Sequence, residues 1–429
     1  MKWTKIITSF MIIFCLAFSV SAEEQGIKSL QRRFDPVIVT GQTCSLTGEP
    51  ILHYGLYALK ENRLIPIPFQ IDEKDEDGKF ILTHGKHITT DNDNNHFDAN
   101  DELVFMAMDT GEKLPGKALL PQGYKACAEI EVTGPVSQEK AWVYLMAFNT
   151  PEYKSSLDYV SYNHKTLSFS TRNYSGHYNK KFPVGASKYA FEEGLGGHGK
   201  DFIDRIKARV KIKSMGITLN RSEEDITVEE EGYIDGPVRV VVYSKNATPL
   251  FLGIPVSATK QYTYYYDSYA DFAFSASFPI KPGYFRATII DDFKDAKGWT
   301  FYNSNNPSGH IIDGKMDDSD KKLDRSPWTW SVLTRDDLSF WSVWIAPPGC
   351  PVKASLYFND DENAKDKMED DPGELPGIGF DFNIGWDKLK ADTVELRLVH
   401  FYTKGYQKGM ETDIRNIYDA PLSATSVTF

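Results

Sequence analysis

Oxygen-bearing side chains recur at nearly every second residue in two short acidic loops near the start of the chain. Such side chains suit calcium, because this ion binds roughly six to eight oxygen ligands. An EF-hand loop supplies them from alternate positions and from a bidentate glutamate at its twelfth position. Counted from Asp91, the second loop places Asp93 and Asn95 at alternate positions and Glu102 at the twelfth. The spacing predicts a calcium site.

Both loops depart from the EF-hand pattern. In the second loop, the sixth position, which normally needs glycine for a left-handed turn, is His96, and the eighth, normally apolar, is Asp98. In the earlier loop Gly78 is in place, but the twelfth position is His84. The candidate calcium ligands are Glu73, Asp75, Asp77, Asp91, Asp93, Asn95, Asp98, Asn100 and Glu102.

The charge of this stretch supports a bound cation. Residues 72–102 contain ten carboxylates and three lysines, and folding them together without a cation would cost like-charge repulsion. The alternative is a pair of solvated turns, since Asp, Asn and Gly are also ordinary turn formers. The histidines of the stretch lack the close spacing of a structural zinc site, and no cysteine is near them.

The first 22 residues have the features of a secretory signal peptide: Lys2 and Lys5, an apolar run, and small residues before Glu23. We therefore expect a periplasmic or secreted protein. Cleavage removes two lysines and no acid, which changes the formal net charge from −12 to −14. This charge argues against nucleic acid and anionic lipid as partners. No later stretch has the roughly 18 apolar residues that span a bilayer.

Three cysteines remain after cleavage, namely Cys44, Cys127 and Cys350. In an oxidising compartment this number predicts one disulfide and one thiol. We expect Cys44 to pair with Cys127, because that bond would cross-link the first domain.

Short apolar runs between turn residues predict an all-β protein. We expect an N-terminal β-domain over residues 23–155, whose edge carries the acidic loops. A larger antiparallel β-sandwich, similar to a supersandwich, is expected over residues 156–429. Helical periodicity is nearly absent, and no repeat of fixed period is visible.

The clearest period-two alternation lies in residues 261–280. Even-numbered positions such as Tyr262 and Phe272 are mostly apolar, and odd-numbered positions such as Gln261 are mostly polar. The pattern predicts two half-buried antiparallel strands with a turn near Asp267. It assigns the even positions to the buried face.

Four tryptophans fall in one predicted hairpin, at positions 328, 330, 341 and 344. Aromatic rings can stack on sugar faces, but aromatic residues at period two more often fill the space between sheets. We expect Trp330 and Trp341 in the core, and we select Trp328 and Trp344 as candidate ligand-binding residues.

The common catalytic motifs are missing, including GxSxG and HExxH. A polysaccharide lyase would need a base such as Tyr or His and a neutralising Arg or metal. His198, Arg205, Tyr264 and Arg286 could serve, yet each has an ordinary structural interpretation.

Two motifs carry a resemblance to known proteins. The runs IPIPFQIDEKDEDGKF and FDANDELVFMAMDTG, followed later by GYIDGPVRVVVYSK, resemble a secreted bacterial family of unknown function. Its architecture is similar to the β-supersandwich of mutarotase-like domains and some polysaccharide lyases. The resemblance implies carbohydrate as the ligand class, but it transfers no active-site residue.

These observations predict an exported, calcium-stabilised protein that binds carbohydrate or an envelope protein. The alternative is a calcium-dependent polysaccharide-processing enzyme, similar to a lyase.

Overall fold

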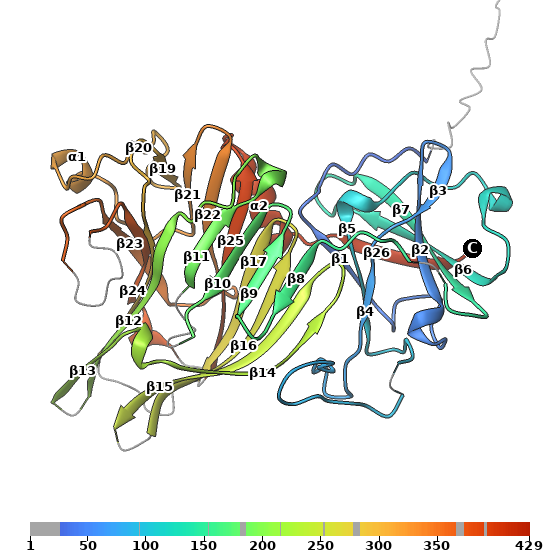
Figure 1. Cartoon of the computed structure of the whole chain (residues 1–429), viewed down its shortest axis with the longest axis horizontal. Coiled ribbons are helices and arrows are strands. Elements are labelled where there is room, and N and C mark those ends of the chain that lie inside the picture. Colours follow the sequence, from blue (N-terminus) through green and yellow to red (C-terminus); the bar gives the residue numbers. More distant parts are fainter. Residues whose placement is uncertain are drawn as a thin grey trace, which may run out of the picture.

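The computed structural model describes residues 26–429, except 94, 153, 181–185, 215, 252–253, 278–283, 366–372 and 390–392. The predicted signal peptide lies outside the described residues. All strand pairing is antiparallel, which confirms the predicted all-β fold (Figure 1). The strands form two groups of sheets, which we name the small lobe and the large lobe.

The small lobe contains a three-stranded sheet in the order β1-β5-β4 and a five-stranded sheet in the order β26-β6-β7-β2-β3. Its strands are β1 (Pro36–Thr40), β2 (Tyr54–Lys60), β3 (Arg63–Pro66), β4 (Gln70–Asp72), β5 (Glu102–Met106), β6 (Tyr124–Thr133), β7 (Lys140–Phe148) and β26 (Ser423–Thr428). Inward side chains of both sheets form one apolar core.

The large lobe contains a four-stranded sheet (β11-β10-β9-β8), a five-stranded sheet (β13-β12-β18-β24-β23) and a nine-stranded sheet (β14-β15-β16-β17-β25-β22-β21-β19-β20). Its strands are β8 (Val160–Asn163), β9 (Ser168–Thr171), β10 (Tyr174–Tyr178), β11 (Ala186–Phe191), β12 (Ile203–Ser214), β13 (Ile217–Arg221), β14 (Thr227–Asp235), β15 (Val240–Phe251), β16 (Ile254–Tyr266), β17 (Tyr269–Ser277), β18 (Tyr284–Phe293), β19 (Thr300–Asn303), β20 (His310–Ile311), β21 (Trp330–Arg335), β22 (Leu338–Ile345), β23 (Lys353–Asn359), β24 (Gly377–Ile384) and β25 (Thr393–Lys404). One apolar core collects side chains from all three sheets, so the lobe is a sandwich.

In the described ranges two α-helices accompany these strands, α1 (Asp318–Lys321) and α2 (Met410–Asp419). Short 3-10 helices lie at Ile51–His53, Ala107–Asp109, Lys117–Leu119, Glu193–Leu195, Glu223–Asp225 and Trp386–Lys388. Helix α2 packs Ile414 and Ile417 against the outer face of the nine-stranded sheet. None of the helices in the described ranges has the length and apolarity that a membrane crossing requires.

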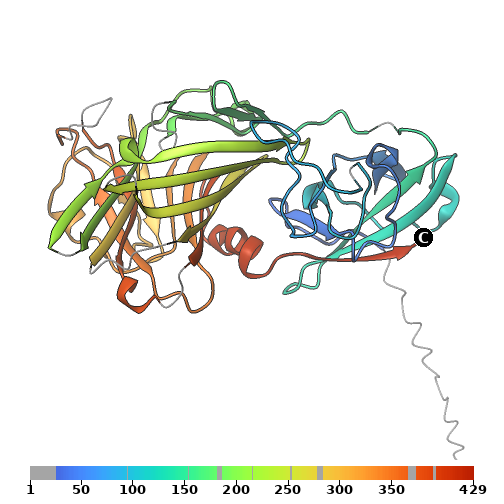
Figure 2. The same cartoon turned by 90° about the horizontal axis from the view of Figure 1, so that it is seen from below.

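The C-terminal strand returns to the small lobe. After α2 the chain runs along the molecule and ends as β26, which pairs with β6 (Figure 2). The sequence boundary placed residues 423–428 in the second domain, because nothing in a short polar strand indicates its distant partner. The small lobe is thus built from both ends of the chain.

The predicted disulfide does not form, since all three cysteines are free thiols. Cys44 is in the core between the two small-lobe sheets. Cys127 belongs to a different apolar cluster, on the opposite face of β6 from Ala128 and Ile130. The five-stranded sheet therefore lies between the two thiols.

The two-residue turn at Asp267 and Ser268 places the odd-numbered residues of β16, and not the predicted even-numbered ones, on the inner face of the sheet. It pairs Tyr266 with Tyr269, so an even position on β16 lies opposite an odd position on β17. Thr263 is therefore opposite Phe272, and Gln261 is opposite Phe274. The prediction that all even positions share one face is wrong, because it ignored this parity change across the turn.

A buried arginine joins the two lobes. Arg239, which is 2% exposed, donates from Nε to Asp72 Oδ2 at 2.8 Å and from Nη2 to Glu102 Oε2 at 2.7 Å. Glu102 also pairs with Lys74. Burial would raise the pKa of Glu102, but Arg239 and Lys74 outweigh burial and lower it. Glu102 is thus an interlobe ion-pair partner, which differs from its predicted role in a calcium loop.

The two motifs that carried the family resemblance meet at this contact. Gln70 Oε1 accepts hydrogen bonds from the backbone N–H groups of Val238 (3.0 Å) and Arg239 (2.9 Å). A Cβ atom at Gly236 would lie 2.3 Å from the same oxygen, so this glycine permits the close approach. The PFQID and GPVR segments therefore form one interlobe contact.

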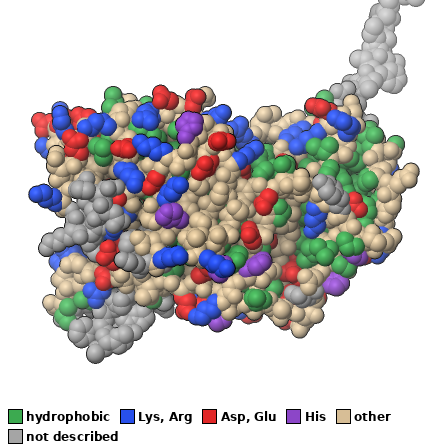
Figure 3. Space-filling view, viewed as in Figure 1, with side chains coloured by type: hydrophobic (Ala, Val, Ile, Leu, Met, Phe, Trp, Pro, Cys, Tyr) green, Lys and Arg blue, Asp and Glu red, His purple; other side chains and the backbone are tan. Residues whose placement is uncertain are grey.

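The surface seen in Figure 3 carries charges of both signs. Lysine and arginine side chains are interspersed with aspartate and glutamate over the large lobe, and apolar side chains gather over the small lobe. On this face the basic side chains form no separate patch.

Replacing Arg239 with methionine tests the interlobe ion pair. We expect Arg239→Met to lower the free energy of unfolding by about 3–5 kcal/mol, because Asp72 would stay buried without its partner. Urea denaturation measures this loss. The control is Arg286→Met, which breaks a pair with Asp381 whose arginine side chain is 42% exposed and should cost under about 1 kcal/mol. Equal small losses would contradict the account.

Candidate functional site

A cavity of about 320 Å³ lies inside the large lobe, between the nine-stranded sheet and the two smaller sheets. Its volume is at the lower end of small-molecule pockets, which span roughly 300–1,000 Å³. Most of the lining side chains are apolar, and a group of neutral polar side chains lies along one wall. This combination makes the cavity the candidate ligand site.

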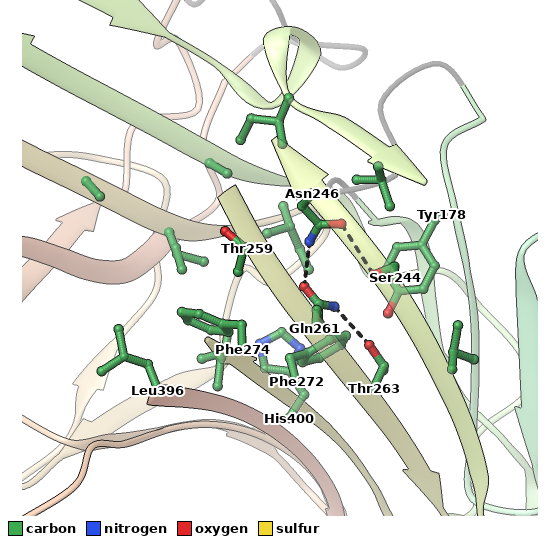
Figure 4. A pocket seen from close by; sticks show the side chains of 18 of the residues that line it. Tyr178, Ser244, Asn246, Thr259, Gln261, Thr263, Phe272, Phe274, Leu396 and His400 are labelled. Atoms are coloured by element: carbon green, nitrogen blue, oxygen red, sulfur yellow. Dashed lines mark hydrogen bonds between the residues drawn. The ribbon is translucent and has the colours of Figure 1, made fainter. Parts of the chain in front are cut away.

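The polar wall comes from neighbouring strands β15 and β16. Ser244 donates to Asn246 Oδ1 at 3.3 Å, Asn246 Nδ2 donates to Gln261 Oε1 at 2.9 Å, and Gln261 Nε2 donates to Thr263 Oγ1 at 2.8 Å (Figure 4). Each amide nitrogen carries a second hydrogen, and the Thr263 hydroxyl keeps its own donor. The wall therefore has hydrogen-bonding capacity left for a ligand.

The rest of the cavity lining is mainly apolar and aromatic. Phe272 and Phe274 come from β17, and Trp344 comes from β22. The five-stranded sheet adds Phe285 and Phe382. Phe272 and Phe274 are cross-strand neighbours of Thr263 and Gln261 in the nine-stranded sheet, whereas Phe285 and Phe382 lie across the cavity, so a ligand would meet aromatic rings both beside the polar row and across from it.

Among the lining side chains, all of which belong to described residues, none is a lysine or an arginine. Glu230 is the carboxylate of the lining, and it accepts a hydrogen bond from the Tyr162 hydroxyl at 2.5 Å. Burial raises the pKa of Glu230, while Tyr162 opposes this rise. Among the described residues, the lining thus offers no cation that could neutralise an acidic ligand.

His400 is the imidazole of the lining, and it is fully buried. Its Nε2 lies 3.5 Å from Asp291 Oδ1, and the Ser342 hydroxyl donates to Asp291 Oδ2 at 2.6 Å. Burial lowers the pKa of His400 to about 3 and raises the pKa of Asp291 to about 7. Under mildly acidic conditions the carboxyl group of Asp291 is therefore protonated and His400 is neutral, so the pair carries no net charge.

The two tryptophans predicted to bind ligand have different places. Trp344 lines the cavity and packs against Phe382, with ring centroids 4.4 Å apart. Trp328 is 3% exposed and stacks on Phe380 at 4.1 Å, so it has no open face. Trp341, predicted to be in the core, is fully buried. Of the two candidates, Trp344 is in contact with the cavity.

Four of the predicted calcium ligands interact with one another. Burial, Asp91 and Asp93 raise the pKa of Glu73. Burial and Asp93 raise the pKa of Asp91, and they also raise that of Asp98. In the part of the chain that the structure describes, no group of three or more His, Cys, Asp or Glu has the arrangement of a metal site. The calcium site stays a prediction.

The other predicted calcium ligands have local partners. Asp75 accepts the backbone N–H groups of Asp77 and Lys79, and Asp77 forms an ion pair with Lys79. Asn100 donates to the Lys74 carbonyl at 2.6 Å. Asn95, the residue before the sixth position of the loop pattern, takes the left-handed conformation, with a φ of 69°.

The four lyase candidates do not form a site. Arg205 is buried in an ion pair with Glu223, and Arg286 pairs with Asp381 near the surface. His198 is exposed. Tyr264 packs against Phe80 on the outer face of the nine-stranded sheet, and none of the four lines the cavity.

Sequence reasoning missed the polar wall and His400. Gln261 and Thr263 were assigned to the outer face, and the pairing across the two-residue turn was the signal that could have corrected this assignment. The alternation of apolar and charged residues along β25 places His400 on the same face as Leu396 and Leu398, which point inward. The sequence gives no sign of its neighbour Asp291, which comes from a different sheet.

No protein-family model matches this chain, and no curated protein matches it. Among solved structures, it is similar to an α-mannosidase from Enterococcus faecalis V583, with a TM-score of 0.51 and 10% identity over 94% of this chain and 45% of that one. The chain therefore spans less than half of that enzyme's length. The likeness supports the β-sandwich fold.

A weaker likeness is to the α-N-acetylgalactosaminidase NagBb from Bifidobacterium bifidum in complex with GalNAc. Its TM-score is 0.35 at 10% identity, over 56% of this chain and 36% of that one. Of these two likenesses, the one to the α-mannosidase is the one that supports the fold.

The buried Asp291–His400 pair has a measurable pH signature. Between about pH 4 and 6.5 an unfolded chain holds the pair's proton on the histidine, and the folded chain holds it on the aspartate. The numbers of bound protons are equal, so the intact pair contributes no slope. In His400→Phe, folded Asp291 keeps a proton that unfolded Asp291 loses, so stability relative to wild type should fall as pH rises from about 4 to 7.

Urea denaturation across this pH range measures the slope, which should reach at most roughly 1.4 kcal/mol per pH unit. Asp291→Asn is the matched variant and should show the opposite slope from about pH 3 to 6.5, because only the unfolded state then binds a proton. If the curves of unfolding free energy against pH are parallel for both variants and wild type, the assignment of a protonated Asp291 and a neutral His400 is wrong.

Proposed function

We propose that this chain is an exported binding protein that holds a neutral carbohydrate in the cavity between the sheets of its large lobe. The observation that carries the proposal is the lining of that cavity. A row of amide and hydroxyl groups on β15 and β16 lies among aromatic rings, and none of the described lining side chains is a lysine or an arginine.

A sugar ring has chemical groups that match both kinds of lining side chain, the polar and the aromatic. Its hydroxyl groups need donors and acceptors, which the remaining capacity of Asn246, Gln261 and Thr263 supplies. Its C–H faces pack on aromatic rings, which Phe274 and Trp344 supply. The fold likeness to the α-mannosidase agrees with this ligand class, and an interior cavity suits a small ligand better than an envelope protein.

The lyase alternative is less well supported by the lining. A lyase that acts on uronic acids must hold a carboxylate, and burying that charge without a cation is costly. The charged group available in this cavity is Glu230, which would repel such a substrate. We therefore favour binding of neutral sugars over elimination chemistry.

Glycan-array and calorimetric measurements on the mature chain test this function. We expect retention of neutral oligosaccharides without turnover. Gln261→Leu should weaken binding about tenfold or more, because a buried hydroxyl would lose its partner. Gln122→Leu, at an exposed position of the small lobe, is the control and should bind like wild type. A product with an ultraviolet-absorbing unsaturated end, or equal binding by both variants, would contradict the proposal.

A second part of the proposal is that calcium stabilises the acidic loops through Glu73, Asp91, Asp93 and Asp98. Its support is the mutual repulsion of these carboxylates, together with Asp91 Oδ1, a buried oxygen without a hydrogen-bond partner among the described residues. Oxygen-rich loops of this kind suit calcium rather than softer metals.

Calorimetric titration of the mature chain with calcium chloride tests this part. We expect binding at or below millimolar calcium and a melting temperature that falls when EDTA is added. Asp93→Asn should abolish both effects. Asp77→Asn is the control, because Asp77 pairs with Lys79, and it should retain them. No heat of binding and an unchanged melting curve would exclude the calcium site.

A further inference from the structure

Three polar side chains meet inside the large lobe beside the cavity. His400 on β25 and Ser342 on β22 are cross-strand neighbours in the nine-stranded sheet. Asp291 comes from β18 in the opposing five-stranded sheet. Their exposed fractions are 0%, 3% and 4%, respectively. Asp291 therefore crosses an apolar core to reach two side chains of the other sheet.

The hydrogen bonding of this group is incomplete. Asp291 Oδ2 has its donor in Ser342, but Asp291 Oδ1 and both ring nitrogens of His400 have no hydrogen-bond partner among the described residues. Such buried groups are rare in proteins and usually indicate a water, an ion or a ligand. Burying these polar groups in an aromatic core without a hydrogen-bond partner costs free energy, so a compensating partner is expected.

The ring of His400 is held by packing rather than by hydrogen bonds. It lies 5.0 Å from Phe340, 5.5 Å from Phe272 and 5.7 Å from Tyr189, measured between ring centroids. Figure 4 shows His400 beside Phe272, below the amide row of Asn246 and Gln261. Its Nε2 lies 3.5 Å from Asp291 Oδ1, and no described side chain bonds to its Nδ1.

We propose that His400 Nδ1 binds one hydroxyl group of the ligand, and that Asp291 acts as a positioning residue that sets which ring nitrogen carries the proton. This subsite rests on the proposed function, because it assumes a hydroxylated ligand in the cavity. If Asp291 donates its proton to Nε2, then Nδ1–H donates to the ligand. If Nε2–H donates to Asp291, then Nδ1 accepts. A hydroxyl group can satisfy either arrangement.

The subsite divides ligand recognition between two walls. The amide row on β15 and β16 would contact one edge of the sugar, and His400 would contact a hydroxyl group at the inner end. Tyr189, the titratable residue among the rings that surround His400, has a strongly raised pKa because it is fully buried, so it stays neutral. Hydroxyl binding at His400 therefore involves no competing charge beyond its partner Asp291.

Nitrogen-detected NMR of the mature chain labelled at histidine and at side-chain amides tests this subsite. The probes are methyl glycosides of mannose, galactose and glucose. We expect a bound glycoside to move the His400 Nδ1 signal together with the amide signals of Asn246 and Gln261. The signal of His310, which pairs with Asp320 at 2.8 Å outside the cavity, serves as the internal reference and should stay fixed.

Two variants complete the experiment. His400→Phe should weaken glycoside binding about tenfold without loss of folding, because phenylalanine fits the surrounding rings but offers no hydrogen bond. His310→Phe is the matched control and should bind like wild type. Asp291→Asn should change the nitrogen shifts that report the His400 tautomer, an effect that a purely structural role would not produce.

The outcomes separate this inference from the function on which it rests. If the amide signals move and His400 does not, or if His400→Phe binds like wild type, the subsite is wrong and carbohydrate binding stands. If none of the three glycosides moves either set of signals, both proposals fail.

Discussion

The ion pairs of Arg239 constrain the whole molecule. Its guanidinium group is buried between the lobes and bonds to Asp72 and Glu102, which begin and end the acidic segment of the small lobe. Arg239 also directly precedes β15, which carries half of the polar wall of the cavity. A buried charge of this kind requires its partners, so it fixes where the small lobe lies against the nine-stranded sheet.

This constraint supports the cavity from outside. Between Asp72 and Glu102, Phe80 and Leu82 pack against the outer face of the nine-stranded sheet, where Phe80 meets Tyr262 at 5.5 Å. Tyr262 and Tyr264 of β16 pack against this segment of the small lobe. Because side chains alternate along a strand, Gln261, Thr263 and Tyr265 then point into the sandwich. The neutral polar wall thus arises because β16 of the nine-stranded sheet is covered on both faces, by the small lobe outside and by the sandwich inside. A wall of this kind selects hydroxyl groups and disfavours charged ligands.

Sequence patterns predicted most of the strands and the sandwich class, because short apolar runs and turn residues act locally. They failed where distant segments meet. Glu102 fits a loop motif by spacing, but Arg239, more than a hundred residues later, takes its carboxylate. Gln261 reads as exposed until the turn at Asp267 fixes the pairing. Trp328 and Trp344 look equivalent in the sequence, and only the packing of Phe380 and Phe382 separates them.

A crystal structure of residues 23–429 grown with a neutral oligosaccharide would locate the bound sugar. If the cavity is the binding site, density for a sugar will lie inside the large lobe, with hydroxyl groups within hydrogen-bond distance of Gln261 and a ring face against Phe274 or Trp344. Sugar bound on the outer surface, with the cavity unchanged, would contradict binding in the cavity.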